Sequence, residues 1–258
     1  MTVVYFFTRY DKLGASSRLR FYQFFPFFRK NVHIASINYL VDNKMLTEFY
    51  HRKKYKFYDI FVAYIKRMYA LVKIKKGSIL VVEKELFPYI PYWVEFFFLK
   101  GKVLILDYDD AIFHQYDQHK NIVVRRFLGN KIDKLLQLAD SVVCGSHYIV
   151  ERAERARAKQ IHLFPTVVDV EYYQIRSLGE NTIPVIVWIG TPATVHYLKI
   201  LEPVLQKLAD TTKFIFRIIG IKEYNIPNVE VQCLLWNTEN EISGLSSADI
   251  GVMPLFET

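Results

Sequence analysis

The chain contains little cysteine and glycine, and it has no long apolar run. Only two of its 258 residues are cysteines and ten are glycines. Two thiols, Cys144 and Cys233, exclude a disulfide framework and a cysteine-cluster zinc site, and their apolar surroundings indicate reduced thiols. No apolar run reaches the ~18 residues that span a bilayer, and Arg9 and Asp11 interrupt the opening apolar stretch too early for a secretory signal. We therefore expect a cytoplasmic protein that is soluble or peripheral at the inner face of the cell membrane.

The abundant residues indicate a folded chain with a basic first part. Hydrophobic residues make up 52% and charged residues 23% of the sequence, a balance typical of a protein with a sizeable core. Residues 1–172 hold 28 Lys and Arg against 17 Asp and Glu, a net charge of +11, whereas residues 173–258 have a net charge of −3. We therefore expect the first part to face something anionic.

An anionic membrane surface is one candidate partner. Basic runs at 52–56 and 73–76 lie near aromatic residues, a combination that favours peripheral binding to anionic lipid. The aromatic clusters at 21–28 and 93–98 are interpreted as core rather than as membrane anchors. No nucleic-acid-binding signature occurs, so nucleic acid is not an expected partner.

Apolar, β-rich runs alternate with helical patterns, which predicts an α/β fold. In the first part the predicted strands are 3–7, 32–39, 79–82, 103–106, 141–144 and 161–164, and the predicted helices include 18–28, 93–99 and 123–139. The pattern restarts after a polar linker, with strands 185–189, 214–219, 229–231 and 250–253 and helices 195–209 and 239–246. We predict two tandem, doubly wound parallel-sheet domains of the Rossmann-like kind, 1–172 and 173–258.

The second domain is expected to be incomplete. Its pattern stops after about four strands, and the last residues directly follow a buried strand, where a loop that carries function belongs. On this interpretation the sequence is a C-terminally truncated fragment.

Ligands in open α/β sheets bind outside the carboxyl ends of the strands, and the first strand is followed by such a candidate site. Gly14 and Ser16 allow backbone N–H groups to approach an anion, and Arg18 and Arg20 add positive charge. A capped helix with a solvated basic face is the alternative. Neither a GxGxxG fingerprint nor a Walker A lysine occurs there.

The fourth predicted strand ends in three carboxylates, Asp107, Asp109 and Asp110, with His114 close behind. Carboxylates this close repel one another unless they bind a cation, hydroxyl groups or backbone N–H groups, and His114 is a candidate for proton transfer or for contact with a sugar hydroxyl. The alternative is that Asp109 or Asp110 only caps the next helix. We name Asp109, Asp110 and His114 as candidate catalytic residues and assign no metal.

Two further strand ends carry polar residues. Ser146 is either an N-cap or a ligand contact. Gly190, Thr191 and Thr194, with His196 on the following turn, offer backbone amides and hydroxyls to a phosphate, although a plain N-cap turn is the alternative.

Four stretches, in this order along the chain, resemble the GT-B glycosyltransferases, most closely family 4, the "glycosyl transferases group 1" type. They are Asp107–Phe113, Pro165–Asp169, Trp188–Leu198 and Ala248–Leu255. The resemblance implies a GT-B architecture and transfer of a sugar, with retention of configuration, from a nucleotide-sugar donor to a glycan or lipid-linked acceptor. It further implies an acceptor-binding first domain, which contains Ser146, a donor-binding second domain, and no requirement for a metal or another cofactor.

The sequence departs from the family pattern at the donor phosphates. Many members hold the diphosphate with an Arg and a Lys after the first strand of the second domain, where this chain has Thr191 and, approximately, His196. By the same resemblance the loop from Gly14 contacts donor phosphate or acceptor, and Arg217 is the candidate that compensates for the missing cations. The family's pair of Glu residues would follow Thr258, so the fragment itself is expected to lack turnover.

The leading hypothesis is therefore a fragment of a membrane-peripheral glycosyltransferase of polysaccharide or glycolipid assembly. A non-catalytic GT-B homologue that serves as a binding or scaffold subunit is the alternative. Another nucleotide-sugar enzyme, such as a GT-B epimerase, is a third.

Overall fold

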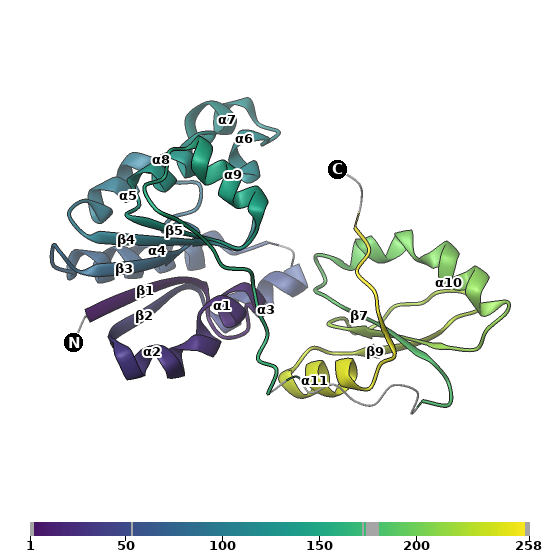
Figure 1. Ribbon diagram of the computed structural model, residues 1–258. Coiled ribbons are helices and arrows are strands. Elements are labelled where there is room, and N and C mark those ends of the chain that lie inside the picture. Colours follow the sequence, from purple (N-terminus) through teal and green to yellow (C-terminus); the bar gives the residue numbers. More distant parts are fainter. Residues whose placement is uncertain (1–2, 53, 172, 174–180, 256–258) are drawn as a thin grey trace. The chain divides into compact units, whose positions relative to one another are not determined.

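The computed structural model describes residues 3–52, 54–171, 173 and 181–255. It contains two parallel sheets, of six and four strands, each flanked by helices (Figure 1). The chain divides into two compact units, one of residues 1–49 and 54–167 and the other of residues 50–53 and 168–258. The predicted fold class, an α/β protein with two parallel-sheet domains of which the second is smaller, is confirmed.

The six-stranded sheet has the order β2-β1-β3-β4-β5-β6, with all strands parallel. Its strands are β1 (Val3–Tyr10), β2 (His33–Val41), β3 (Ile79–Glu83), β4 (Val103–Tyr108), β5 (Ser141–Cys144) and β6 (Ile161–Leu163). From β1 the chain runs to the edge strand β2 and then returns to the other side of β1 to form β3. The strand order therefore reverses between β1 and β3, and ligands of open α/β sheets bind at such a switch point.

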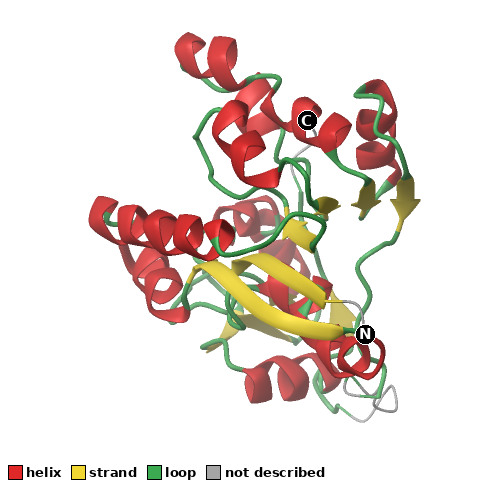
Figure 2. Cartoon of the chain, turned by 90° about the vertical axis from the view of Figure 1, so that its left-hand side faces the viewer, coloured by secondary structure: helices red, strands yellow, loops and turns green. Residues whose placement is uncertain are grey.

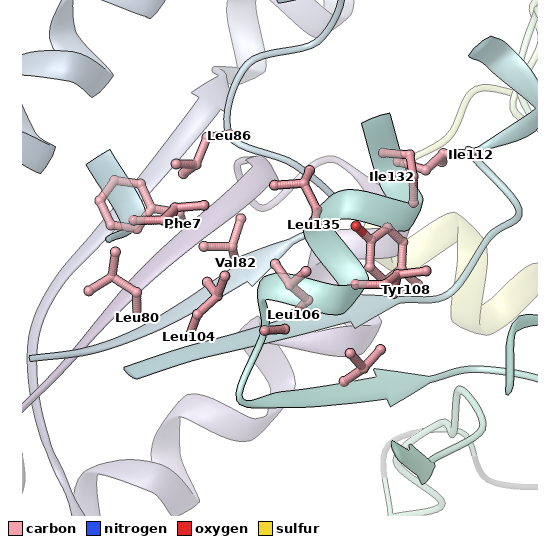
Figure 3. Packing of buried hydrophobic residues seen from close by; sticks show 14 of the residues in the cluster. Phe7, Leu80, Val82, Leu86, Leu104, Leu106, Tyr108, Ile112, Ile132 and Leu135 are labelled. Atoms are coloured by element: carbon pink, nitrogen blue, oxygen red, sulfur yellow. The ribbon is translucent and has the colours of Figure 1, made fainter. Parts of the chain in front are cut away.

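Helices cover both faces of this sheet (Figure 2). They are α1 (Ala15–Arg20), the 3-10 helix η1 (Tyr22–Phe24), α2 (Phe25–Asn31), α3 (Asn43–Arg52), α4 (Phe57–Val72), α5 (Tyr92–Leu99), α6 (His114–Asp117), α7 (Ile122–Leu128), α8 (Lys131–Leu138) and α9 (His147–Arg155). On one face Leu71 of α4, Leu99 of α5 and Leu135 of α8 pack on the apolar side chains of the strands. Figure 3 shows part of this core, with Ile132 and Leu135 of α8 beside residues of β3 and β4. On the other face Phe21 and Phe25 pack against Val4 and Phe6 of β1.

The second unit contains the four-stranded sheet, in the order β10-β7-β8-β9. Its elements are β7 (Val185–Ile189), η2 (Val195–Ile200), α10 (Glu202–Ala209), β8 (Ile215–Ile219), β9 (Glu230–Leu234), α11 (Thr238–Ser246) and β10 (Ile250–Gly251). Ile186, Trp188, Phe216 and Ile218 form its core with Leu205 of α10. Because β10 pairs with β7 on the side away from β8, the strand order of this sheet reverses between β7 and β10.

Three predicted helices are wrong as single elements. The helix expected at 18–28 is divided into α1, η1 and α2, and Pro26, which lacks an N–H, sits in the first turn of α2. The helix expected at 123–139 is divided into α7 and α8 at Gly129 and Asn130. The helix expected at 195–209 is divided into η2 and α10, with Pro203 in the first turn of α10. The strand β4 runs two residues further than predicted, so Asp107 lies within the strand instead of after it.

The two aromatic clusters differ in burial. Phe21 and Phe25 of the first cluster are core residues, as predicted. In the second cluster Trp93 and Phe97 are 70% and 77% exposed, so the interpretation of that cluster as core is only partly correct. None of the helices in the described part of the chain is both long and apolar enough to cross a bilayer.

Candidate functional site

Seven polar side chains gather at the switch point of the first sheet. The carboxyl ends of β1, β3 and β4 lie side by side because the strands are parallel and in register. The helix α1 follows β1 after a short turn and brings its own side chains onto these ends. We call the group the switch-point cluster; its members are Ser16, Ser17, Arg20, Glu83, Lys84, Asp107 and Asp109.

Glu83 is the centre of the cluster and is fully buried. Its Oε2 accepts hydrogen bonds from the backbone N–H of Arg9 (2.7 Å) and from the Ser17 hydroxyl (2.5 Å). Its Oε1 lies 2.9 Å from Ser16 Oγ. Burial raises the pKa of Glu83, although Lys84 and the hydrogen bonds from Ser17, Arg9 and Ser16 oppose this.

The hydroxyl of Ser16 contacts two carboxyl groups but has one proton to donate. Its Oγ contacts both Glu83 Oε1 and Asp109 Oδ2. Because a hydroxyl donates one hydrogen bond, one of the two carboxyl groups must supply the other proton. Burial of Asp109 is outweighed by Lys84 and Ser16, which lower its pKa, whereas the pKa of Glu83 is raised. The arrangement that satisfies both contacts is a protonated Glu83 donating to Ser16 and Ser16 donating to an ionised Asp109.

Lys84 connects this pair to the backbone of β4. Its Nζ lies 3.0 Å from Asp109 Oδ1, and its N–H donates to the Asp107 carbonyl (2.8 Å). Burial would lower the pKa of Lys84, but the charge of Asp109 and its hydrogen bond raise it. Lys84 has a φ of 65°, a left-handed conformation that costs a residue with a Cβ about 1 kcal/mol. Such strain concentrates at functional sites, where surrounding contacts maintain it.

Arg20 and Asp107 form a buried bidentate pair. Arg20 Nε and Nη2 lie 2.9 and 2.6 Å from the two carboxylate oxygens, and Nη1 donates to the Phe164 carbonyl (2.5 Å). Burial raises the pKa of Asp107 to about 6 against the opposing effect of Arg20. Asp107 therefore contacts Arg20 instead of forming a carboxylate triad with Asp109 and Asp110.

A second ionic group is buried beside the cluster. Lys131 Nζ lies 2.6 Å from Glu85 Oε2, 2.7 Å from Glu95 Oε1 and 2.7 Å from the Phe87 carbonyl. The Tyr116 hydroxyl donates to Glu85 (2.7 Å). Burial raises the pKa of Glu95, although Lys131 opposes this. This group ties α8, α5 and α6 to the loop after β3 and so fixes the position of Glu83 and Lys84.

Asp110 and His114, the other two candidate catalytic residues, lie outside the switch-point cluster. Asp110 is exposed, and its Oδ1 accepts from the N–H of Ala111 (3.0 Å). The capping alternative is wrong, because α6 begins at His114 with Phe113 as its N-cap and without a side-chain cap. His114 Nδ1 lies 2.9 Å from Asp117 Oδ1 and its Nε2 lies 2.7 Å from the Tyr148 hydroxyl. Among the described residues no hydrogen bond or ion pair joins His114 to Asp109 or Asp110.

Three more predicted residues lie on the first unit. Gly14 is buried and is the N-cap of α1, and a Cβ there would lie 2.2 Å from Tyr10 Cβ. Arg18 lies on α1, partly buried. Ser146 is the exposed N-cap of α9, and its side chain makes no capping hydrogen bond. Their predicted roles in ligand binding stay predictions.

In the second unit, the loop after β7 lies at the switch point of the smaller sheet. The N–H of Thr191 donates to Thr194 Oγ1 (2.9 Å), and Thr194 Oγ1 donates back to the Thr191 carbonyl (3.1 Å). Gly190 lies against Gly220, which has a φ of 115° and whose Cβ, if present, would lie 1.8 Å from the Gly190 carbonyl oxygen. Glycine is thus needed at position 220, where the loops after β7 and β8 meet.

The two basic side chains predicted for this loop are placed differently. His196 is exposed, and its Nδ1 lies 2.9 Å from the Ala193 carbonyl. Arg217 lies in the middle of β8 instead of at its carboxyl end. Its guanidinium donates to Gln232, to the Gly244 carbonyl and to Ser247, and so holds α11 against the sheet. Because these hydrogen bonds are made within the fold, they do not support the phosphate-binding role of Arg217, which stays a prediction.

Neither a metal site nor a large cavity marks the cluster. No group of three or more His, Cys, Asp or Glu among the described residues has the geometry of a metal site. A cavity of about 220 Å³ lies between the end of β2, α3 and α4, and no residue of the switch-point cluster lines it.

Sequence reasoning did not identify Glu83 or Lys84 as site residues. Glu83, Lys84 and Glu85 directly follow the buried strand β3, so the signal was available: charged residues at the carboxyl end of a strand. Arg20 was expected to add charge for an anionic ligand, whereas in the structure it is buried and pairs with Asp107.

Of three comparisons with known proteins, the one with solved structures found matches. No family model and no curated protein matches the chain. Among solved structures 27 chains match, including the crystal structure of TarM, with 12% sequence identity and a TM-score of 0.46. That match covers 73% of this chain, which spans 39% of the length of the TarM chain.

Proposed function

We propose that the protein is a glycosyltransferase that moves a sugar from a nucleotide-sugar donor to a glycan or lipid-linked acceptor. The observation that carries the proposal is that both sheets have polar groups at their switch points, β1/β3 and β7/β10, where open α/β sheets bind ligands. The sequence resemblance to GT-B enzymes supports the same assignment.

In this proposal the two units have different roles. The loop from Gly190 to Thr194 provides backbone amides and two hydroxyls for the donor diphosphate. Asp109, kept ionised by Lys84 and Ser16, accepts a hydrogen bond from a sugar hydroxyl. His114, held by Asp117 and Tyr148, is a second contact for a hydroxyl.

The test is release of nucleoside diphosphate from a panel of nucleotide-sugars, measured with and without glycan and glycolipid acceptors, alongside calorimetric titration of each donor. Thr191→Val and Asp109→Asn should each reduce the rate at least tenfold. Thr212→Val, which changes an exposed threonine outside the loop, is the control and should leave it unchanged. A chain that neither binds nor turns over any nucleotide-sugar contradicts the proposal.

A binding or scaffold subunit of the same fold is the second candidate. It is favoured by the loop after β7, where Thr191 and Thr194 bond to each other and Thr191 stands where the resemblance expects an arginine. In that case a nucleotide-sugar binds in the titration, but no diphosphate is released with any acceptor. Release of diphosphate would favour the enzyme over the scaffold subunit.

A further inference from the structure

The helix α4 turns an apolar face to solvent. Phe57, Tyr58, Phe61, Ile65, Tyr69 and Val72, here called the α4 stripe, are exposed by between 47% (Ile65) and 85% (Phe57). Their spacing places them on one side of the helix. A surface helix ordinarily presents polar residues on this side, whereas α4 is apolar on its exposed side as well as on the side that faces the core.

The stripe is exposed because hydrogen bonds and core packing fix the opposite side of α4. Arg67 is 2% exposed, and its guanidinium donates to the carbonyls of Leu86 (3.1 Å), Asn38 (2.9 Å) and Thr8. Leu71 is buried in the main core. Rotating α4 to bury the stripe would break these hydrogen bonds and expose Leu71, so the fold itself keeps the stripe in solvent.

The neighbouring helix α5 adds two exposed aromatic residues, Trp93 and Phe97. Tyr64 of α4 and Phe98 of α5 both pack against the ring of Phe87, at 5.4 and 5.9 Å, so the two helices share one layer over the sheet. The stripe alone exposes on the order of 600 Å² of side chain, the upper end for the largest apolar patch of a monomer.

Lysines surround this apolar surface. Between residues 54 and 76 the sequence has a single acid, Asp59, and six lysines, all of them exposed: Lys54, Lys56, Lys66, Lys73, Lys75 and Lys76. Lys73 Nζ lies 3.9 Å from the centre of the Tyr69 ring, so cation and stripe are adjacent. An apolar helix face flanked by lysines is the arrangement of a helix that lies in a membrane interface.

We propose that the α4 stripe, with Trp93 and Phe97, inserts into the interface of a bilayer that contains anionic lipids, while the lysines contact the lipid phosphates. A second copy of the chain fits less well, because two-fold docking would bring the same lysines together. Lysine is also depleted at protein interfaces, whereas aromatic and basic residues together are typical of membrane surfaces. The proposal does not depend on the glycosyltransferase assignment.

Flotation with vesicles tests the proposal. Wild-type protein should float with phosphatidylcholine vesicles that contain one third phosphatidylglycerol, and much less with phosphatidylcholine alone or at high salt. Both Phe61→Ser/Ile65→Ser/Tyr69→Ser and Lys73→Gln/Lys75→Gln/Lys76→Gln should weaken binding at least tenfold. These side chains are exposed, so thermal melts should match the wild type.

Matched controls come from the second unit. Val204→Ser/Leu235→Ser and Lys199→Gln/Lys207→Gln/Lys222→Gln change exposed residues of the same kinds and should keep binding within twofold of wild type. Trp93 should also shift its fluorescence to shorter wavelength with anionic vesicles, and Trp93→Phe should abolish that change. The proposal would be overturned if the wild type does not bind anionic vesicles, or if the control variants lose as much binding as the α4 variants. It would also be overturned if light scattering shows a dimer that only the stripe variant disrupts.

Discussion

The contacts of Ser16 predict that Glu83 carries a proton, and two substitutions test this prediction. One keeps a hydrogen-bond donor at this position and the other removes the side chain. Ser16 Oγ contacts Glu83 Oε1 and Asp109 Oδ2 and has one proton for both. Because Lys84 favours the ionised form of Asp109, the second proton belongs to Glu83. An amide N–H in Glu83→Gln replaces the acid O–H and donates to Ser16 in the same way.

The two variants should differ by several kcal/mol. Glu83→Gln keeps every hydrogen bond and should change the free energy of unfolding by less than about 1 kcal/mol. Glu83→Ala leaves the N–H of Arg9 and the hydroxyl of Ser17 without acceptors at a fully buried position, each costing about 1–3 kcal/mol. With the cavity that forms, we expect a loss of about 4 kcal/mol.

Urea denaturation at pH 7 measures both variants. Glu154→Ala, which removes an exposed carboxylate from α9, is the control and should stay within about 0.5 kcal/mol of the wild type. Infrared spectra should show a protonated-carboxyl C=O band in the wild type that is absent from Glu83→Gln. Glutamine as damaging as alanine, or no such difference in the spectra, would refute the reasoning.

Three further substitutions test other parts of the structure. Because burial raises the pKa of Asp107 to about 6, the folded state holds this proton more tightly than the unfolded state. As the pH rises from 4 to 6, the wild type should therefore lose about 2 kcal/mol of unfolding free energy relative to Asp107→Asn; denaturation curves across that range that show no change contradict this. Lys131→Met leaves Glu85 and Glu95 buried without their cation and should lower the free energy of unfolding by about 3–5 kcal/mol. Lys134→Met, which changes an exposed lysine on the same helix, should lower it little, and equal effects of the two variants in denaturation would contradict the buried pairing. Gly220→Ala places a Cβ 1.8 Å from the Gly190 carbonyl oxygen and should lower the melting temperature more than Gly77→Ala. Gly77 also has a positive φ, of 79°, but no atom lies near the position of its Cβ. The reverse order would mean that the loops after β7 and β8 are not in contact.

The strands could be predicted from the sequence because each is a short apolar run bounded by turn residues. Both sheets, their strand numbers and the polar strand ends follow from that pattern. The divisions of the helices could not be placed, since Pro26 and Pro203 begin new helices without interrupting the apolar periodicity.

The switch-point cluster was only partly predictable because its charged residues pair with residues far away in the sequence. Asp109 and Ser16 stand out as polar residues after strands, but Glu83, Arg20 and Lys131 resemble solvated surface charges until their partners are known. Those partners lie 67, 87 and 46 residues away, so no local pattern connects them. His114 shows the converse: its sequence position beside three aspartates suggested one site, yet its contacts are with Asp117 and Tyr148.

Hydrogen exchange of the backbone amides, with and without saturating nucleotide-sugar, tests the central claim most directly. The account predicts protection on donor binding at residues 190–195, at the switch point of the second sheet, and on addition of acceptor at residues 16–20, 83–85 and 107–110. Protection confined to the opposite ends of the strands, such as residues 211–214 and 228–230, or no protection with any nucleotide-sugar, would contradict it.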